Sequence, residues 1–235
     1  WAMDTGFAQT SSYLVCCLKV PGRRQNRALR RHVPMAKARG LFEESWIPSL
    51  MLSLDEALNR AQSLVDAARK AGADAADAVY GCDASAGVSV RLGQLEDIER
   101  SESEHVGLRV FVGQRSATVS SSDLAPRTLE TLVERVIAMA KEAPEDKYAG
   151  LAPEDRLMRK KLPNLDIDDG EEPDMAQLRA RALEVEDAAR SVTGVTNSEG
   201  GGAGHGRAQA ALVTSHGFAS AYAGTQYSIW ASVLA

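Results

Sequence analysis

Two runs of alternating apolar and polar residues constrain the fold of this chain more than any other feature. The first spans residues 88–92 and ends at Gly93, and the second spans residues 106–112 and ends at Gly113. A period of two gives each strand one face to bury and one face for solvent, and a glycine after such a run marks a tight turn. We expect residues 95–100 and 116–120 to pair beside these runs, so that the four segments form an antiparallel meander.

Helical signals flank the meander on both sides. Ser53 followed by Glu56 is a capping-box pattern, and apolar residues then recur at helical spacing as far as Ala68. A second helix is predicted over residues 123–143 and is stopped by Pro144. Both helices can cover one face of the meander, which predicts a two-layer α+β fold: an antiparallel meander sheet packed on two helices.

A third helix and a β-rich segment complete the predicted order. Asp174 with Gln177 forms a looser capping box, and the helix is expected to end at Gly194. Two β-like stretches, 207–214 and 218–234, follow it. We therefore divide the chain into an N-terminal α+β domain over 51–150, a linker over 151–173, and the start of a truncated middle or C-terminal domain over 174–235.

Residues 1–50 differ from the rest in charge and pattern. They carry eight Lys and Arg against three Asp and Glu, with no sustained period of two or 3.6. A DNA-binding arm and an organellar transit peptide are alternative interpretations of this basic segment. We favour extra sequence ahead of a translation start at Met51, and we expect this segment to be disordered.

Charge and cysteine content narrow the class of protein. The formal net charge is −5, and residues 51–235 alone carry −10, which argues against direct nucleic-acid binding. The three cysteines form no disulfide framework, which favours a reducing, cytoplasmic location. Since no apolar run approaches the roughly 20 residues of a membrane span, we expect no membrane association.

The stretch NSEGGGAGHGR at residues 197–207 holds five glycines within seven residues. Neither the spacing of a dinucleotide-binding fingerprint nor that of a phosphate-binding P-loop fits it. Glycine permits positive φ and the close approach of another backbone, so we interpret the stretch as a requirement of backbone geometry. The residues that we consider candidates for peptide binding or an interface are Glu199, Gly200, Gly201, Gly202 and Arg207.

The other candidates for chemistry are weaker. None of the four histidines, His32, His105, His205 and His216, is followed by Glu, and no G-x-S-x-G motif is present. His205 and His216 could meet across a turn with Cys82, but a histidine in such a place is more often only hydrogen-bonded. We therefore assign no catalytic and no metal-ligating residue, and we predict that the chain alone neither binds zinc tightly nor cleaves peptides.

Six segments occur in a characteristic order, at residues 87–96, 107–113, 120–124, 146–151, 198–202 and 214–218. In their residues and their order they resemble the TldD/PmbA family, and within it the PmbA (TldE) branch. The resemblance spans residues 51–235 and leaves residues 1–50 outside it.

This resemblance implies a function. Family members pair into a hetero-oligomeric, cytoplasmic metallopeptidase that acts on unfolded or precursor peptides. The TldD-like partner carries zinc on an HExxxH helix, a motif that this sequence lacks. The expected partners are thus a TldD-like protein and a peptide substrate, with no cofactor in this chain. The alternative is a non-enzymatic modulator, for example of DNA gyrase or of a toxin–antitoxin system.

Overall fold

The computed structural model describes residues 13–19, 51–160 and 163–235, of which 13–19 are described as backbone only. The elements in chain order are β1 (Tyr13–Lys19), α1 (Leu54–Lys70), β2 (Ala75–Arg91), β3 (Gln94–Val112), β4 (Arg115–Ser121), α2 (Pro126–Glu142), the 3-10 turn η1 (Glu154–Arg156), α3 (Met175–Arg190), β5 (Asn197–Thr214) and β6 (Ala219–Leu234). The predicted α+β class is confirmed. No helix in the described ranges is long and apolar enough to cross a membrane.

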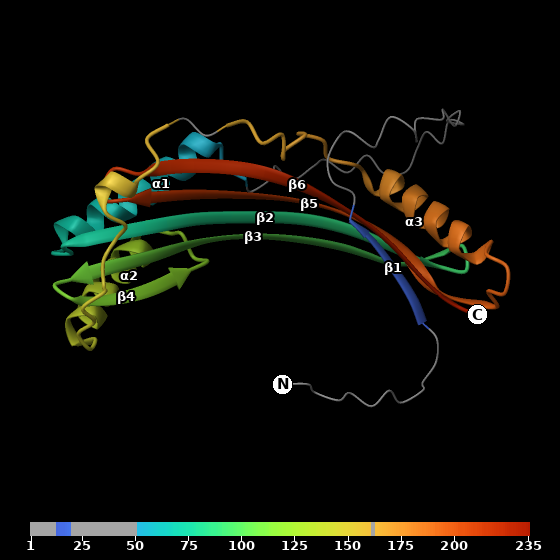
Figure 1. Ribbon diagram of the computed structural model, residues 1–235, viewed down its shortest axis with the longest axis horizontal. Helices are drawn as coiled ribbons and strands as arrows, with labels where there is room; N and C mark the ends of the chain where they lie inside the picture. The colour runs from blue at the N-terminus through green and yellow to red at the C-terminus, as the bar shows by residue number, and fades with distance from the viewer. Residues whose placement is uncertain (1–12, 20–50, 161–162) are drawn as a thin grey trace.

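One antiparallel sheet of six strands forms the body, in the order β1-β6-β5-β2-β3-β4. Figure 1 shows the long strands as a curved arch, with α1 and α3 on the outer side at opposite ends. Residues 174–235, which the sequence assigns to the opening of a second domain, contribute β5 and β6 to the same sheet, since β5 pairs with β2 from Asp77↔Thr214 to Val90↔Gly201. The predicted domain boundaries at residues 150 and 173 stay a prediction.

The helices begin and end where local chemistry dictates. In α1, Ser53 Oγ accepts from the Glu56 amide at 3.2 Å, and Glu56 Oε2 accepts from the Ser53 amide at 2.9 Å. The equivalent box at Asp174 and Gln177 opens α3. The second helix begins at Pro126 rather than at Asp123, because proline suits the first helical position.

The strands of the meander are longer and fewer than the sequence predicts. Residues 95–100 and 106–112 were expected to be separate strands, but they form the single strand β3, which pairs with β2 from Gln94 to Phe111 with one bulge. The polar residues 101–105 between them carry no apolar alternation, although the backbone ladder continues through them. The turns at Gly93 and Gly113 are confirmed, and both glycines have positive φ.

Two apolar cores lie on the same face of the sheet. In the larger one, α1 and α2 pack over one end, where Tyr80, Leu108 and Val136 are fully buried. In the smaller one, α3 packs over Val88 and Val90 at the other end. This placement follows from the register, because alternate residues of β2 from Ala76 to Val90 point to the same face.

Part of residues 1–50 contributes to the sheet. Although no regular element was expected there, β1 pairs antiparallel with β6, from Tyr13↔Leu234 to Lys19↔Ser228. The run YLVCCLK is rich in residues that favour strands, and the outer edge of β6 offers unpaired backbone groups to it. Residues 1–12 and 20–50 lie outside the described residues, so the predicted start at Met51 stays a prediction.

Candidate functional site

The glycine stretch lies inside β5 rather than in a turn, and other groups approach its backbone closely. Gly200 has φ +121° at a bulge, and a Cβ there would stand 2.8 Å from the Val90 carbonyl oxygen. A Cβ on Gly201 would stand 3.0 Å from Glu186 Cβ. On Gly202 it would stand 2.3 Å from Trp230 Nε1, so the indole lies directly over this glycine. The interpretation as backbone geometry is confirmed.

The charged residues that flank the glycines do not meet. Glu199 is exposed at the bulge of β5, whereas Arg207 is eight residues further along the same strand, or ~26 Å at the usual rise of a strand. The structure therefore separates the five candidate residues into Glu199–Gly202 near α3 and Arg207 at mid-strand. Their role in binding a peptide or a partner stays a prediction.

A buried carboxylate near these glycines was missed by the sequence analysis. Glu186 on α3 is fully buried and accepts hydrogen bonds from Ser198 Oγ at 2.5 Å, the Leu92 amide at 2.7 Å and the Gly93 amide at 2.9 Å. Burial by itself would raise the pKa of Glu186, but the three hydrogen bonds outweigh it and hold the pKa below its ordinary value. We call this arrangement the Glu186 clamp. It ties α3 to the β2–β3 turn and to the start of β5.

The signal that could have revealed the clamp is a spacing of four. Leu178, Ala182 and Glu186 are the buried residues of α3 and lie on one stripe of the helix. A carboxylate that continues an apolar stripe is unusual, because it must find donors when it is buried.

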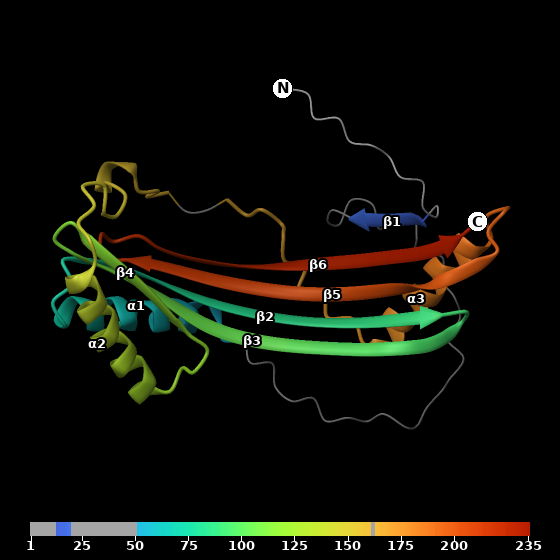
Figure 2. The ribbon, with the colours of Figure 1, turned by 90° about the horizontal axis from the view of Figure 1, so that it is seen from below.

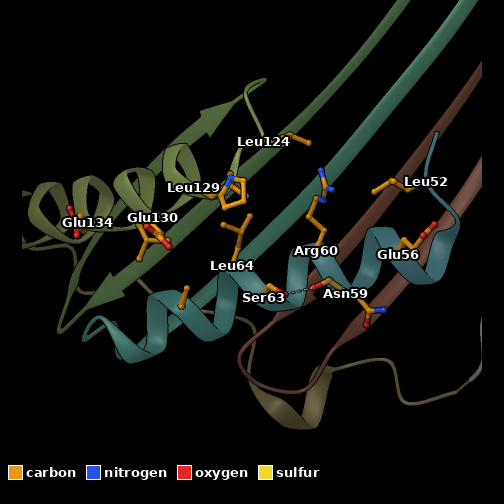
Figure 3. Close-up of a pocket in the computed structure, with 13 residues that line it drawn as sticks. Leu52, Glu56, Asn59, Arg60, Ser63, Leu64, Leu124, Leu129, Glu130 and Glu134 are labelled. Carbon is orange, nitrogen blue, oxygen red and sulfur yellow. Dashed lines mark hydrogen bonds between the residues drawn. The ribbon is translucent and has the colours of Figure 1, made fainter. Parts of the chain in front are cut away.

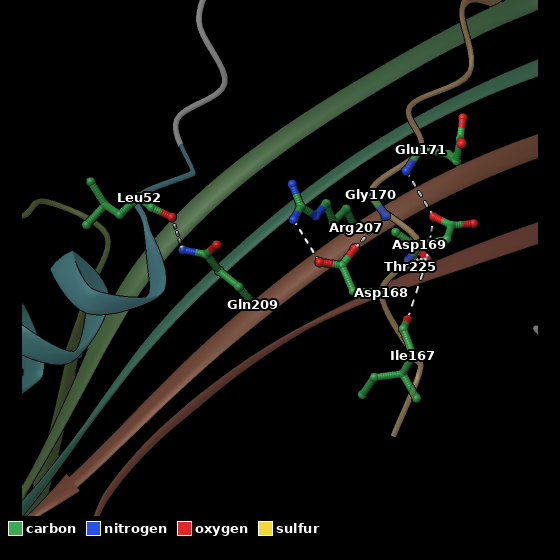
Figure 4. A network of polar contacts seen from close by, with 9 residues as sticks. All are labelled: Leu52, Ile167, Asp168, Asp169, Gly170, Glu171, Arg207, Gln209 and Thr225. Atoms are coloured by element: carbon green, nitrogen blue, oxygen red, sulfur yellow. Dashed lines mark hydrogen bonds and ion pairs between the residues drawn. The ribbon is translucent and has the colours of Figure 1, made fainter. Parts of the chain in front are cut away.

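Between α1 and α3, the linker lies on the sheet. Its side chains form a second set of polar contacts with β5 and β6, which we call the strap cluster. Figure 4 shows Asp168 and Asp169 of the linker beside β5 and β6. Its members are Asp168, Asp169, His205, Arg207, Thr225 and Tyr227.

Both side-chain and backbone hydrogen bonds join the linker to the sheet at the strap cluster. Arg207 Nη2 donates to Asp168 Oδ2 at 2.8 Å, and Tyr227 Oη donates to Asp169 Oδ2 at 2.9 Å. The Thr225 amide donates to the Ile167 carbonyl at 2.8 Å, so the linker also pairs with the backbone of β6. These contacts fix residues 167–169 to the middle of the sheet.

Burial sets the protonation of the strap cluster. It lowers the pKa of His205 against the opposing pull of Asp169, and it raises the pKa of Tyr227, assisted by the hydrogen bond to Asp169. His205 is therefore neutral and Tyr227 keeps its proton near neutral pH. His205 Nε2 has no hydrogen-bond partner among the described residues, and its ring lies 5.0 Å from that of Tyr227 between centroids.

The histidines and the cysteine do not converge. His205 faces the helices, whereas His105 lies over Gly81 on the opposite face of the sheet, and His216 lies in the β5–β6 turn. Cys82 is buried beside Tyr80 in the larger core. Within the described part of the chain, no group of three His, Cys, Asp or Glu side chains is placed to hold a metal ion.

A groove of about 640 Å³ runs between α1 and α2. Figure 3 shows apolar residues such as Leu64 and Leu129 within it and the charged residues Glu56, Arg60 and Glu130 around them. The described residues that line it include no histidine or cysteine, and Glu56 is already engaged in the cap of α1. The groove is thus lined by apolar side chains with carboxylates and an arginine at its rim.

Comparisons with known proteins agree on one family. The family model described as "PmbA/TldA metallopeptidase domain 1" matches residues 76–140, which hold most of β2, all of β3 and β4, and most of α2. The chain is 31% identical over 188 residues to the "Metalloprotease PmbA homolog" of Haemophilus influenzae, covering 79% of this chain and 41% of that protein. It is 29% identical over 185 residues to the "Metalloprotease PmbA" of Escherichia coli O157:H7, covering 77% and 40%.

Solved structures show the same fold. A protein of Bacteroides thetaiotaomicron, described as a candidate modulator of DNA gyrase, superposes with a TM-score of 0.70 at 22% identity, over 76% of this chain and 41% of that one. The chain thus spans about two fifths of the length of the relatives it matches.

Proposed function

Because the chain belongs to the TldD/PmbA family, on its PmbA/TldE-like side, we propose that it is the N-terminal part of a metallopeptidase subunit. In this proposal the subunit assembles with a TldD-like partner in the cytoplasm and acts on unfolded or precursor peptides. The observation that carries the proposal is the identity of 31% over 188 residues to a protein named as a metalloprotease homolog.

We further propose that the catalytic zinc belongs to the TldD-like partner. The described residues of this chain do not fit a zinc site, since a catalytic zinc needs three protein ligands in fixed geometry and His105, His205 and His216 lie apart. No HExxxH motif occurs in the 235 residues to preset two ligands on a helix.

The contribution proposed for this chain is shape and binding surface. The long strands leave the face away from the helices exposed, with Leu212 and Tyr222 on it, and the Glu186 clamp and the strap cluster hold the strands, α3 and the linker together. A rigid curved sheet of this kind suits the recognition of extended polypeptides through backbone pairing, which is tolerant of sequence. That tolerance fits a peptidase of unfolded chains.

The test is reconstitution of the full-length protein with a TldD-like partner. We expect the two to co-purify and to cleave an unfolded peptide, and we expect a chelator to abolish cleavage. A partner with the HExxxH glutamate changed to glutamine is the matched control, since it should assemble normally and remain inactive. Co-purification without cleavage would favour the alternative, a non-enzymatic modulator.

A second measurement concerns this chain alone. Calorimetric titration with zinc should give no stoichiometric submicromolar binding, and a fluorogenic peptide should not be cleaved. Tight binding that disappears in a double variant, His205→Ala with His216→Ala, would contradict the placement of zinc on the partner.

A further inference from the structure

One edge of the sheet lacks a strand partner along half its length. β3 pairs with β2 throughout, but β4 pairs with the other side of β3 only from Val106 to Val112. Among the described strands, none pairs with that side of residues 94–105, and Figure 2 shows this part of β3 as the border of the sheet. Residues 94–101 are all exposed.

Exposed apolar side chains gather at this border. Leu92 is 50% exposed, Leu95 is 40% exposed and Ile98 is 51% exposed. Leu95 and Ile98 pair with Val90 and Val88 of the smaller core, but α3 packs over β2, β5 and β6 and leaves the end of β3 uncovered. At the other end of β3, β4 and α2 cover the corresponding positions. The smaller core is therefore open on its β3 side.

The tip of this border is held in a strained shape. Leu92 has φ +50°, a conformation that leucine rarely adopts. The Glu186 carboxylate accepts hydrogen bonds from the backbone amides of Leu92 and Gly93. Such strain persists where the surroundings impose it, and it is concentrated at functional surfaces. Here it presents the Leu92 side chain to solvent.

The charge of the border identifies the kind of occupant. Residues 94–105 carry five carboxylates and one arginine: Glu96, Asp97, Glu99, Glu102, Glu104 and Arg100. Two copies of the chain that paired through this border would place acidic residues opposite each other, which is destabilising. The Asp97 carboxylate also accepts from the Ile98 amide at 2.9 Å, a local bond that protects the edge from unselective pairing.

We propose that residues 94–105 of β3 bind an extended segment of a different polypeptide, in which basic residues alternate with apolar ones. The segment adds a strand to the sheet by backbone pairing, and its apolar side chains cover Leu95 and Ile98. Its basic side chains face Asp97 and Glu99, which the register places on the opposite face of β3. On binding, the Ile98 amide releases the Asp97 carboxylate and donates its hydrogen bond to a backbone carbonyl of the bound segment instead. This proposal does not depend on peptidase activity, so it can fail or hold independently of the proposed function.

The experiment uses the 235-residue chain and a fluorescent peptide of about ten residues that alternates lysine and valine. We expect saturable binding that weakens as salt rises, and at least about tenfold weaker binding of a glutamate–valine peptide and of a proline-interrupted peptide. Hydrogen exchange should show protection of residues 94–105 on binding. Equal binding of the three peptides, or protection confined to another part of the sheet, would overturn the proposal.

Variants test the apolar half of the surface. Leu95→Ser with Ile98→Ser should weaken binding at least about tenfold while leaving the fold intact, because both side chains are exposed. The matched control is Val79→Ser with Leu212→Ser, which changes two exposed apolar residues of other strands and should bind as the parent does. An equal loss in both double variants, or in neither, would count against the assigned surface.

Discussion

Removal of the Glu186 carboxylate should strongly destabilise the protein, because three donors depend on it. In Glu186→Ala the Ser198 hydroxyl and the amides of Leu92 and Gly93 lose a charged acceptor. A hydrogen bond to a charged group contributes ~1.5–3 kcal/mol, with the lower values where water can replace the lost partner, as it can at the turn. We therefore expect a loss of about 3–5 kcal/mol in the free energy of unfolding.

Two variants separate the clamp from the rest of the helix. Glu186→Gln keeps the stem that packs under Gly201 and removes only the charge, so its loss should be smaller, about 1–2 kcal/mol. Glu184→Ala removes an exposed carboxylate of the same helix, which pairs with Arg181 at 2.9 Å, and should change stability by less than about 0.5 kcal/mol.

The pH dependence of the free energy of unfolding tests the Glu186 clamp independently. Since the folded state lowers the pKa of Glu186, the ionised carboxylate stabilises the protein above its unfolded pKa of about 4.3. That stabilisation is lost as pH falls through the folded pKa. The difference in the free energy of unfolding between the parent and Glu186→Gln should therefore be largest at neutral pH and should shrink in acid.

Urea unfolding followed by circular dichroism measures these differences. With a slope of roughly 2 kcal/mol per molar urea, the midpoint for Glu186→Ala should fall by about 1.5–2.5 M. Hydrogen exchange at the Leu92 and Gly93 amides should accelerate in the same variant. An unchanged midpoint, or a difference from Glu186→Gln that grows in acid, would refute the clamp as a stabilising unit.

Three further predictions concern backbone geometry. Gly113→Val should lower stability by about 1–3 kcal/mol, because Gly113 has φ +59° in open space and only strain is added, whereas Gly87→Ala, with no atom near its added Cβ, should leave the melting midpoint nearly unchanged. Leu92→Asn should stabilise by about 0.5–1 kcal/mol, because asparagine tolerates positive φ; a lower melting midpoint would contradict the assigned turn. Gly202→Val should displace the Trp230 indole and shift its fluorescence. Trp230→Ala identifies which part of the spectrum comes from this indole. An unaltered spectrum in Gly202→Val would show that the ring does not lie over this glycine.

The sequence determined the features that depend on near neighbours. The capping boxes at Ser53 and Asp174 and the turns at Gly93 and Gly113 form within a few residues, so their signals are readable along the chain. The alternating runs likewise announced strands, although the polar residues 101–105 hid that two of the runs are one strand.

Only the tertiary structure decided which segments meet. The Glu186 carboxylate is 94 residues from the Leu92 amide in sequence, and the two lie together in the fold in which β5, the strand after α3, pairs with β2. The strap bond between Asp168 and Arg207 likewise requires the linker to cross the sheet. A hydrogen bond between distant residues leaves no periodic signal in the sequence, because the positions of its partners are set by the backbone ladder and the apolar cores.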